Sequence, residues 1–402
     1  MRILMVNKFL YSRGGCENYM LYLGEHLKKL GHEVEYFGMY DEKNTVGNSA
    51  EKYTFNMDFH SKGLSRFLYP FKIIYSFEAK KKIMQVIDAF KPDIVHMNNI
   101  NFQLTPSIIY GIKKKGIPLV QTVHDYQMIC PNHLLYNFEK NEICEKCIKG
   151  SLGSCIKNKC IHGSKVKSIL GAIEAWLYGV LGTYKKVDLY ISPSYFLEEK
   201  LVSAKDLYKG KVKTIHNFID KEKFTCEGRE TKDYIAFAGR LSKEKGVEYL
   251  GEVAKLLPEY NFRVAGDGPD KDILENIENL ELIGFLSGEK LTEFMGNAKA
   301  ILVPSIWYEN CPLSILEAQA MGVAVFTINN GGMAELVKDG VTGALARECT
   351  PVGIAEAIRK TVENEEFYNS LRENCKKERD NILSVETYCE ILTKEYENLI
   401  AR

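Results

Sequence analysis

The sequence predicts an α/β protein made of two domains, each built on a parallel sheet. Its 402 residues are enough for two separate hydrophobic cores. Short apolar runs alternate with helical patterns along the chain, which is typical of parallel strands joined by right-handed crossovers. The glycine-rich and charged motifs fall where the apolar runs end, and such sheets bind ligands at the carboxyl ends of their strands.

The first domain is expected to cover residues 1–218. Its first strand, 3–6, leads through Ser12-Arg13-Gly14-Gly15 into a helix at 17–30, which Gly31 ends. The remaining elements are strands at 34–38, 93–97, 118–123 and 188–192, with helices at 76–90 and 106–115.

The second domain is expected to cover residues 219–384, after a boundary within the polar stretch 217–232. Its strands are expected at 234–238, 262–265, 280–283, 300–303 and 323–327. The last segment, 385–402, has apolar residues at helical spacing over 385–400, namely Tyr388, Ile391, Leu392, Tyr396 and Leu399.

Composition and charge narrow the class of protein. The chain is 45% hydrophobic and 26% charged, as in soluble globular proteins, and it has neither a signal-peptide pattern nor a membrane-spanning apolar run, so a cytoplasmic protein is expected. Residues 1–218 hold 31 Lys and Arg against 20 Asp and Glu, whereas residues 219–402 hold 22 against 33. This asymmetry fits either an anionic partner of the first domain or attraction between the domains. No nucleic-acid-binding motif is present, so nucleic acid is not the expected partner.

Glu309 and Glu317, with seven residues between them, form the most informative motif. The run 300–304 predicts a buried strand, and Pro312 suits the first turn of the next helix. Glu309 would then lie on the loop, and Glu317 about one and a half turns into the helix. Free N–H groups at the helix start can bind phosphate, and the carboxylates can accept bonds from sugar hydroxyls. The alternative is two solvated glutamates.

Cations and glycines follow other strands. Arg240 and Lys245 flank a turn, where they can neutralise a diphosphate without a metal; a basic surface loop is the alternative. Gly14-Gly15 and Gly266-Asp267-Gly268-Pro269 would let the backbone approach a ligand, or they are plain turns. Neither is the dinucleotide pattern G-x-G-x-x-G, which disfavours a nicotinamide-dependent oxidoreductase.

Together with His124-Asp125 and Gly284-Phe285, these motifs occur in the order seen in the family-4 retaining glycosyltransferases, which the chain resembles over nearly its whole length. The resemblance implies the GT-B fold, in which two Rossmann-like domains face each other across a cleft and the C-terminal helix crosses back to the first domain. It also implies a UDP- or GDP-linked sugar donor, a saccharide or lipid-linked acceptor, and no cofactor for catalysis.

Position by position, the resemblance implies a catalytic set: Glu309, His124, Arg240 and Lys245. The implied donor-binding set is Gly14, Gly15, Gly268, Phe285, Leu286, Asn310, Pro312, Leu313 and Glu317. The acceptor-side candidates are Arg13, Asn98, Asn99 and Tyr126. Asn98 departs from the histidine that relatives often carry, and for His124 a satisfied strand-end histidine is the alternative.

The implied reaction is sugar transfer with retention, in the assembly of a surface polysaccharide, with Glu309 positioning the donor rather than attacking it. A GT-B epimerase or phosphorylase is the main alternative, because a fold does not fix the chemistry. A NAD-dependent oxidoreductase is the less favoured one.

A Cys-rich insertion covers residues 130–162. Cys144, Cys147, Cys155 and Cys160, with Cys130 as an alternative ligand, have spacing suited to a structural zinc ion. The insertion has no evident core of its own, so a metal would hold it together. Unpaired thiols and disulfides are the alternatives. The expected role of the insertion is to shape the acceptor site.

Two segments, 62–77 and 168–184, mix aromatic and apolar residues with nearby lysines. Each is a candidate for peripheral contact with an anionic membrane, at the inner face of the plasma membrane. Ordinary core packing explains both segments equally well.

Overall fold

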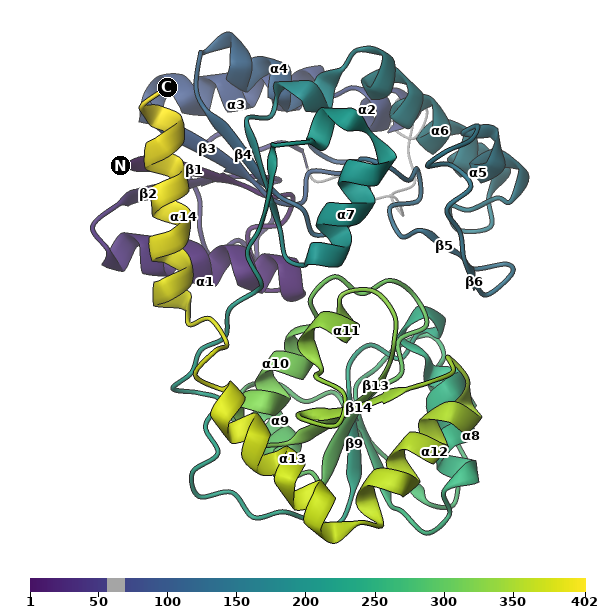
Figure 1. Ribbon diagram of the computed structural model, residues 1–402. Helices are drawn as coiled ribbons and strands as arrows, with labels where there is room; N and C mark the ends of the chain where they lie inside the picture. Colours follow the sequence, from purple (N-terminus) through teal and green to yellow (C-terminus); the bar gives the residue numbers. More distant parts are fainter. Residues whose placement is uncertain (56–68) are drawn as a thin grey trace.

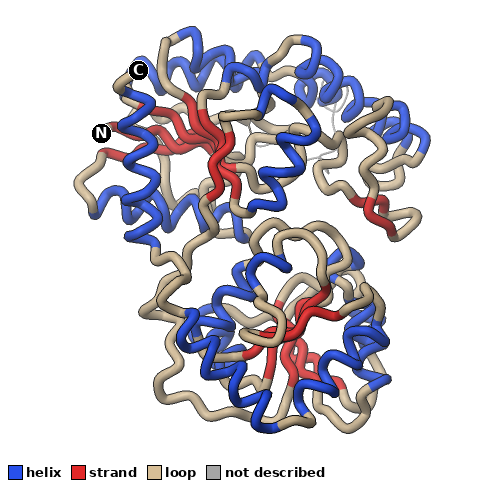
Figure 2. Tube along the Cα trace, viewed as in Figure 1, coloured by secondary structure: helices blue, strands red, loops and turns tan. Residues whose placement is uncertain are grey.

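Each of two α/β domains has a six-stranded parallel sheet with helices on both faces (Figure 1, Figure 2). The structure, a computed structural model, describes residues 1–55 and 69–402. Covered on both faces, such strands are apolar along their length instead of alternating. Strand Ala300–Val303, for example, is buried at every position. The predicted fold class is confirmed.

The N-terminal sheet has the strand order β2-β1-β3-β4-β7-β8. Ile3 of β1 lies opposite Val34 of β2 and Ile94 of β3. The strands are β1 (Arg2–Val6), β2 (Glu33–Phe37), β3 (Ile94–Met97), β4 (Leu119–Thr122), β7 (Leu189–Ser192) and β8 (Val212–Thr214). The helices are α1 (Gly15–Lys29), α2 (Tyr69–Ile74), α3 (Phe77–Phe90), α4 (Ser107–Lys114), α5 (Gly153–Lys157), α6 (Lys165–Val180) and α7 (Tyr195–Ala204), with 3-10 turns η2 (Thr183–Lys186) and η3 (Asp206–Tyr208).

The C-terminal sheet has the strand order β11-β10-β9-β12-β13-β14. Its strands are β9 (Ile235–Ala238), β10 (Phe262–Ala265), β11 (Leu280–Gly284), β12 (Ala300–Val303), β13 (Ala324–Ile328) and β14 (Gly343–Ala346). The helices are α8 (Val247–Leu256), α9 (Gly288–Gly296), α10 (Leu313–Ala320), α11 (Met333–Leu336), α12 (Pro351–Val362) and α13 (Glu365–Glu378), with 3-10 turns η4 (Lys243–Lys245) and η5 (Lys271–Leu274).

The C-terminal helix α14 (Val385–Ile400) returns to the N-terminal domain and packs beside α1 (Figure 1). Tyr388, Leu392 and Tyr396 are fully buried in one cluster with residues of α1 and β1. Their spacing places them on one face of the helix. The predicted return of the last helix is confirmed.

The Cys-rich insertion contains a short hairpin, β5 (Tyr136–Asn137) and β6 (Glu142–Ile143), followed by α5. It extends toward the C-terminal domain (Figure 1), where Asn141 Nδ2 lies 3.5 Å from Glu248 Oε2. Cys130 and Leu135 join the core of the N-terminal domain, so the insertion is not held by its own residues alone.

Within residues 1–55 and 69–402, no helix is both long and apolar enough to span a membrane. Of the two candidate membrane segments, residues 62–68 lie outside the described residues. The segment 168–184 lies mostly in α6.

Candidate functional site

The candidate residues of the two domains meet between the carboxyl ends of β4 and β12. His124 follows β4, and Glu309 lies on the loop between β12 and α10. Asn310 Nδ2 donates to the backbone oxygen of His124 at 3.0 Å, which joins the two loops directly. The residues that the sequence placed on different domains therefore converge on one site.

Glu309 is 7% exposed, and one of its carboxylate oxygens accepts three hydrogen bonds. Its Oε1 accepts bonds from Lys245 Nζ at 2.5 Å, Trp307 Nε1 at 2.8 Å and Ser305 Oγ at 2.9 Å. Burial raises the pKa of Glu309, but Lys245, Trp307 and Ser305 outweigh it and hold the pKa below its ordinary value. Glu309 is therefore ionised, and its Oε2 has no bonding partner among the described residues.

Lys245 reaches Glu309 because the chain turns sharply behind it. Gly246 ends η4 with a φ of +75°, and a Cβ there would lie 2.0 Å from the backbone oxygen of Pro304. Only glycine tolerates both the conformation and the contact. The turn thus brings Lys245 against the end of β12, with its ammonium 5.2 Å from the centre of the Trp307 ring.

A glycine pair that the sequence did not single out supports the Glu309 loop. Gly332 N donates to the backbone oxygen of Glu309 at 2.7 Å. A Cβ on Gly332 would lie 1.7 Å from the backbone oxygen of Asn310, and Gly331 has a φ of +60°. The signal was available as Gly331-Gly332, which follows a buried strand after two asparagines. The supporting bonds from Ser305 and Trp307, in contrast, carry no sequence signal.

Arg240 is exposed on the loop after β9, and its guanidinium has no bonding partner within the described residues. The neighbouring loop packs against this one, because Leu241 N donates to Asp267 O at 3.0 Å. A Cβ on Gly268 would lie 2.2 Å from the backbone oxygen of Leu241. Glycine is therefore required at position 268 by the close approach of the adjacent loop. Contact between Gly268 and a donor stays a prediction.

Helix α10 begins one residue after Pro312, which is its N-cap residue, so the predicted helix start is correct to within one residue. Leu313 and Glu317 line a cavity between the domains together with Tyr19 and Lys223. Burial raises the pKa of Glu317 to about 7, although Lys223 opposes the shift.

The other donor candidates lie at the start of α1 and after β11, and their contacts with a donor stay predictions. Gly14 is the N-cap residue of α1, and both Gly14 and Gly15 are exposed at the start of that helix. Phe285 is 77% exposed after β11, whereas Leu286 packs against the core of the C-terminal domain.

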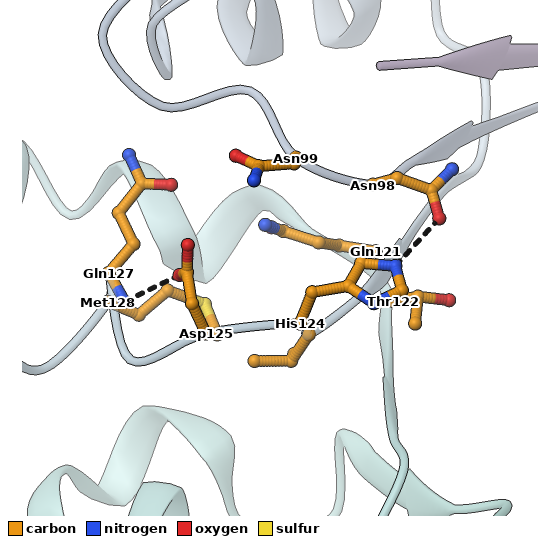
Figure 3. Close-up of a pocket in the computed structure, with 9 residues that line it drawn as sticks. Asn98, Asn99, Gln121, Thr122, His124, Asp125, Gln127 and Met128 are labelled. Carbon is orange, nitrogen blue, oxygen red and sulfur yellow. Dashed lines mark hydrogen bonds between the residues drawn. The ribbon is translucent and has the colours of Figure 1, made fainter. Parts of the chain in front are cut away.

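His124 lines a small polar cavity at the end of β4 (Figure 3). Its Nε2 lies 3.1 Å from Asn98 Oδ1, and the Tyr19 ring meets it edge-on at 5.0 Å between centroids. Burial lowers the pKa of His124 to about 4, so the imidazole is neutral at pH 7. Asn98 Nδ2 and Gln121 Oε1, both buried at this cavity, have no bonding partner in the described part of the chain.

The acceptor-side candidates are only partly brought together. Asn98 and Asn99 line the cavity beside His124. Arg13 is exposed, with its guanidinium 4.2 Å from the centre of the Phe9 ring. Tyr126 is 1% exposed, and its hydroxyl donates to the backbone oxygen of Tyr308 at 3.4 Å. Tyr126 therefore links the two domains, and its contact with an acceptor stays a prediction.

The five cysteines of the insertion are unpaired thiols: Cys130, Cys144, Cys147, Cys155 and Cys160. Across residues 1–55 and 69–402, no three His, Cys, Asp or Glu side chains are grouped so that they could hold a metal ion. The structural zinc ion stays a prediction, which metal analysis of the purified protein would test.

Two family models match the chain. Residues 13–223 match the family described as Glycosyltransferase Family 4, and residues 218–378 match Glycosyl transferases group 1. An uncharacterized 42.6 kDa protein in the cps region of Klebsiella pneumoniae is 27% identical over 353 residues, which are 84% of this chain and 87% of that protein. A 2-deoxystreptamine N-acetyl-D-glucosaminyltransferase of Niallia circulans is 31% identical over 166 residues, 39% of this chain and 42% of that protein.

Solved structures share the fold over the whole chain. Anabaena Alr3699/HepE in complex with UDP and glucose has a TM-score of 0.69 and 16% identity, covering 99% of this chain and 100% of that one. A sucrose-phosphate synthase from Thermosynechococcus elongatus also has a TM-score of 0.69, with 16% identity and coverage of 100% and 99%. With the family match over more than half of its residues, this two-domain GT-B chain belongs to the family-4, group 1 glycosyltransferases.

Proposed function

We propose that this glycosyltransferase moves a sugar from a UDP- or GDP-linked donor to a saccharide or lipid-linked acceptor, with retention of configuration. The observation that best supports this proposal is the state of the Glu309 carboxylate. It is ionised, its Oε1 accepts three hydrogen bonds, and its Oε2 has no bonding partner among the described residues. A hydroxyl of the donor sugar would donate to the free oxygen. Arg240 and Lys245, which follow β9 in the same domain, would bind the diphosphate.

Charge accounts for the reaction step. Breaking the bond between sugar and phosphate develops positive charge on the sugar ring and negative charge on the leaving diphosphate. Arg240, Lys245 and the start of α10 would stabilise the diphosphate. The neutral imidazole of His124 adds no positive charge beside the ring.

In the proposed reaction, configuration is retained by a substitution on one face of the sugar. The acceptor oxygen forms its bond to the sugar carbon on the face from which the diphosphate leaves, and the diphosphate takes the acceptor's proton. Glu309 then acts by fixing the donor sugar in place, and such positioning contributes several kcal/mol.

The relatives support a nucleotide-sugar donor and a role in surface polysaccharide assembly. The Anabaena protein is bound to UDP and glucose, and the Klebsiella relative belongs to a cps region. An epimerase or phosphorylase would use the same fold. Product analysis separates them, because transfer gives a new glycoside, phosphorolysis gives a sugar phosphate, and epimerisation gives an altered donor.

The experiment that tests the donor site is thermal unfolding with UDP, GDP, ADP and NAD. At about a hundredfold above Kd, a ligand adds about 2.7 kcal/mol, which raises Tm by a few degrees. We expect one nucleoside diphosphate to raise Tm in the wild type and not in Arg240→Ala. Arg359→Ala, which removes a partly exposed arginine of α12 that pairs with Glu259, is the matched control. A shift with NAD alone would contradict the transferase proposal.

The proposal includes peripheral contact with an anionic membrane through α6. Val166, Trp176 and Val180 are 67%, 58% and 67% exposed on this helix, and Ile173 is 41% exposed. Val166, Ile173 and Val180 are seven residues apart and share one side of the helix. The flanking Lys165, Lys167, Lys185 and Lys186 are exposed as well. Apolar side chains beside cations are suited to the headgroup region of anionic lipids.

A further inference from the structure

Tyr308 is a residue of the C-terminal domain that packs on the core of the N-terminal domain. Its ring lies 4.7 Å from the Phe196 ring and 6.4 Å from the Tyr126 ring, between centroids. The ammonium of Lys200 lies 4.9 Å from the centre of the same ring. Three residues of the N-terminal domain thus surround one side chain of the other domain.

Glu145 of the Cys-rich insertion completes these surroundings. Its Oε1 accepts a bond from the Tyr308 hydroxyl at 2.9 Å and from Lys200 Nζ at 2.5 Å. Because Lys200 forms an ion pair with the same oxygen, the bond from Tyr308 is charge-assisted, which makes it stronger than a neutral one.

Tyr308 directly precedes Glu309 in the chain. The three bonds that hold the Glu309 carboxylate come from the C-terminal domain itself. The Tyr308 side chain, in contrast, fixes this loop relative to the N-terminal domain, on which His124 lies. The relative position of Glu309 and His124 thus depends on what Tyr308 contacts.

We propose that Glu145 and Tyr308 are positioning residues, which set Glu309 against His124 when the two domains close. The contact between Glu145 and Tyr308 is seen in the structure, whereas its effect on catalysis rests on the proposed sugar transfer. Cys144 and Cys147 flank Glu145 in the sequence. The role of the insertion is accordingly to deliver the Glu145 carboxylate to the other domain.

Hydrogen exchange of the backbone tests the contact without any substrate. The wild type is compared with Glu145→Ala and with Tyr308→Phe, which keeps the ring and removes only the hydroxyl. Exchange of the amides in 305–311 is expected to rise about tenfold in both variants, the size for one lost charge-assisted hydrogen bond. Glu139→Ala, which removes an exposed carboxylate from the same insertion, is expected to leave this exchange unchanged. Unchanged exchange in either test variant overturns the proposal.

Kinetics with the donor identified by thermal unfolding tests the consequence. We expect kcat to fall about tenfold in Tyr308→Phe and in Glu145→Ala, while Kd for the nucleoside diphosphate changes less than about twofold, because the donor contacts remain. The double variant is expected to lose no more than either single variant, because both remove the same bond. An unchanged kcat, or equal losses in Glu139→Ala, overturns the positioning role. A wild type that transfers no sugar contradicts the proposed function instead, and hydrogen exchange still decides whether the contact exists.

Discussion

Glu309 shows how much of the proposed chemistry depends on single atoms. Replacing it with Ala removes the free Oε2 that would bind the donor sugar and leaves Lys245 without its partner. We expect transfer to fall by at least about a hundredfold, because misplaced reactants lose rate on that scale. Nucleotide affinity is expected to survive, since Arg240 and the start of α10 are unchanged.

The measurement is kcat together with Kd for the nucleoside diphosphate. Glu289→Ala, an exposed glutamate on α9, controls for the loss of one charge in the same domain. Transfer near the wild-type rate in Glu309→Ala would rule out the assigned role.

Glu174 on α6 predicts a dependence of stability on pH. It is 3% exposed, and burial raises its pKa to about 8, against about 4.3 in an unfolded chain. Between these values the folded protein binds one more proton than the unfolded chain. The free energy of unfolding therefore falls as pH rises through this window, by an amount on the order of a few kcal/mol.

Glu174→Gln removes this titration while keeping the shape of the side chain. We expect the Tm of Glu174→Gln minus that of the wild type to be larger at pH 8.5 than at pH 5. Glu199→Gln, an exposed residue of α7, should show the same difference at both pH values. A Tm difference for Glu174→Gln that does not change with pH would disprove the shift.

At the scale of elements, the exposed side of α6 predicts lipid binding. The chain has two tryptophans, Trp176 on α6 and Trp307 beside Glu309, so a Trp307→Phe variant leaves Trp176 as the reporter. With anionic vesicles at low salt, we expect its fluorescence to shift to shorter wavelength as the ring leaves water. The shift is expected to weaken at about 0.5 M salt, where charge attraction is screened.

A matched pair of variants distinguishes a specific apolar contact through α6 from non-specific binding to vesicles. Val180→Ser is expected to reduce the fraction of protein that pellets with vesicles. Val352→Ser, which changes a 54%-exposed valine of α12, should leave it unchanged. Equal pelleting of both variants and the wild type would exclude α6 as the lipid-binding surface.

Elements with a strong local pattern could be predicted to the residue. Strands 262–265 and 300–303 and the helix 385–400 match β10, β12 and α14 at both ends. Strand 300–303 is a continuous apolar run, strand 262–265 is interrupted only by Arg263, and the helix repeats its apolar residues at helical spacing. Strands β8 and β14 escaped prediction. Val212–Thr214 is short and half-buried at a sheet edge, and Gly343–Ala346 is made mostly of small residues.

The sequence motifs predicted which residues belong to the candidate site, but not the contacts between the two domains. Lys245 and Glu309 meet because β9 and β12 are neighbours in one parallel sheet and end at the same edge, whereas the approach of His124 depends on how the two domains face each other. The contacts of Tyr126 and Tyr308 were not predictable, because they join segments about 180 residues apart and depend on how the domains close. Patterns within a short stretch of sequence do not predict contacts between segments so far apart.

The C-terminal helix is connected to the His124 region by buried hydrogen bonds. Tyr388 and Tyr19 share a bond of 2.7 Å between hydroxyls, and Tyr19 lies 3.1 Å from Thr122 Oγ1. Thr122 also bonds His96 Nε2 at 2.7 Å, and His96 Nδ1 bonds the hydroxyl of Tyr396. Thr122 ends β4 two residues before His124. The last helix therefore helps to fix the strand end from which His124 extends.

At the scale of the whole molecule, the domains are joined by bonds that depend on closure. Glu335 of α11 accepts bonds from the backbone nitrogens of Tyr195 at 2.8 Å and of Phe196, at the start of α7 in the other domain. It also lies 3.1 Å from His216 Nε2. A carboxylate at a helix start stabilises it by about 1 kcal/mol. Here the carboxylate and the helix belong to different domains. The free energy of this capping interaction therefore stabilises the closed arrangement.

Glu335→Ala is therefore expected to shift the molecule toward an open arrangement. Small-angle X-ray scattering should give a larger radius of gyration for this variant than for the wild type, while Glu356→Ala, an exposed residue of α12, should match the wild type. Because the proposed donor contacts of Arg240 and Lys245 lie within one domain, nucleotide affinity should change little while kcat falls. An unchanged radius of gyration together with an unchanged kcat would mean that Glu335 does not control closure, and that Tyr308 and the bond from Asn310 to His124 suffice to hold the two domains together.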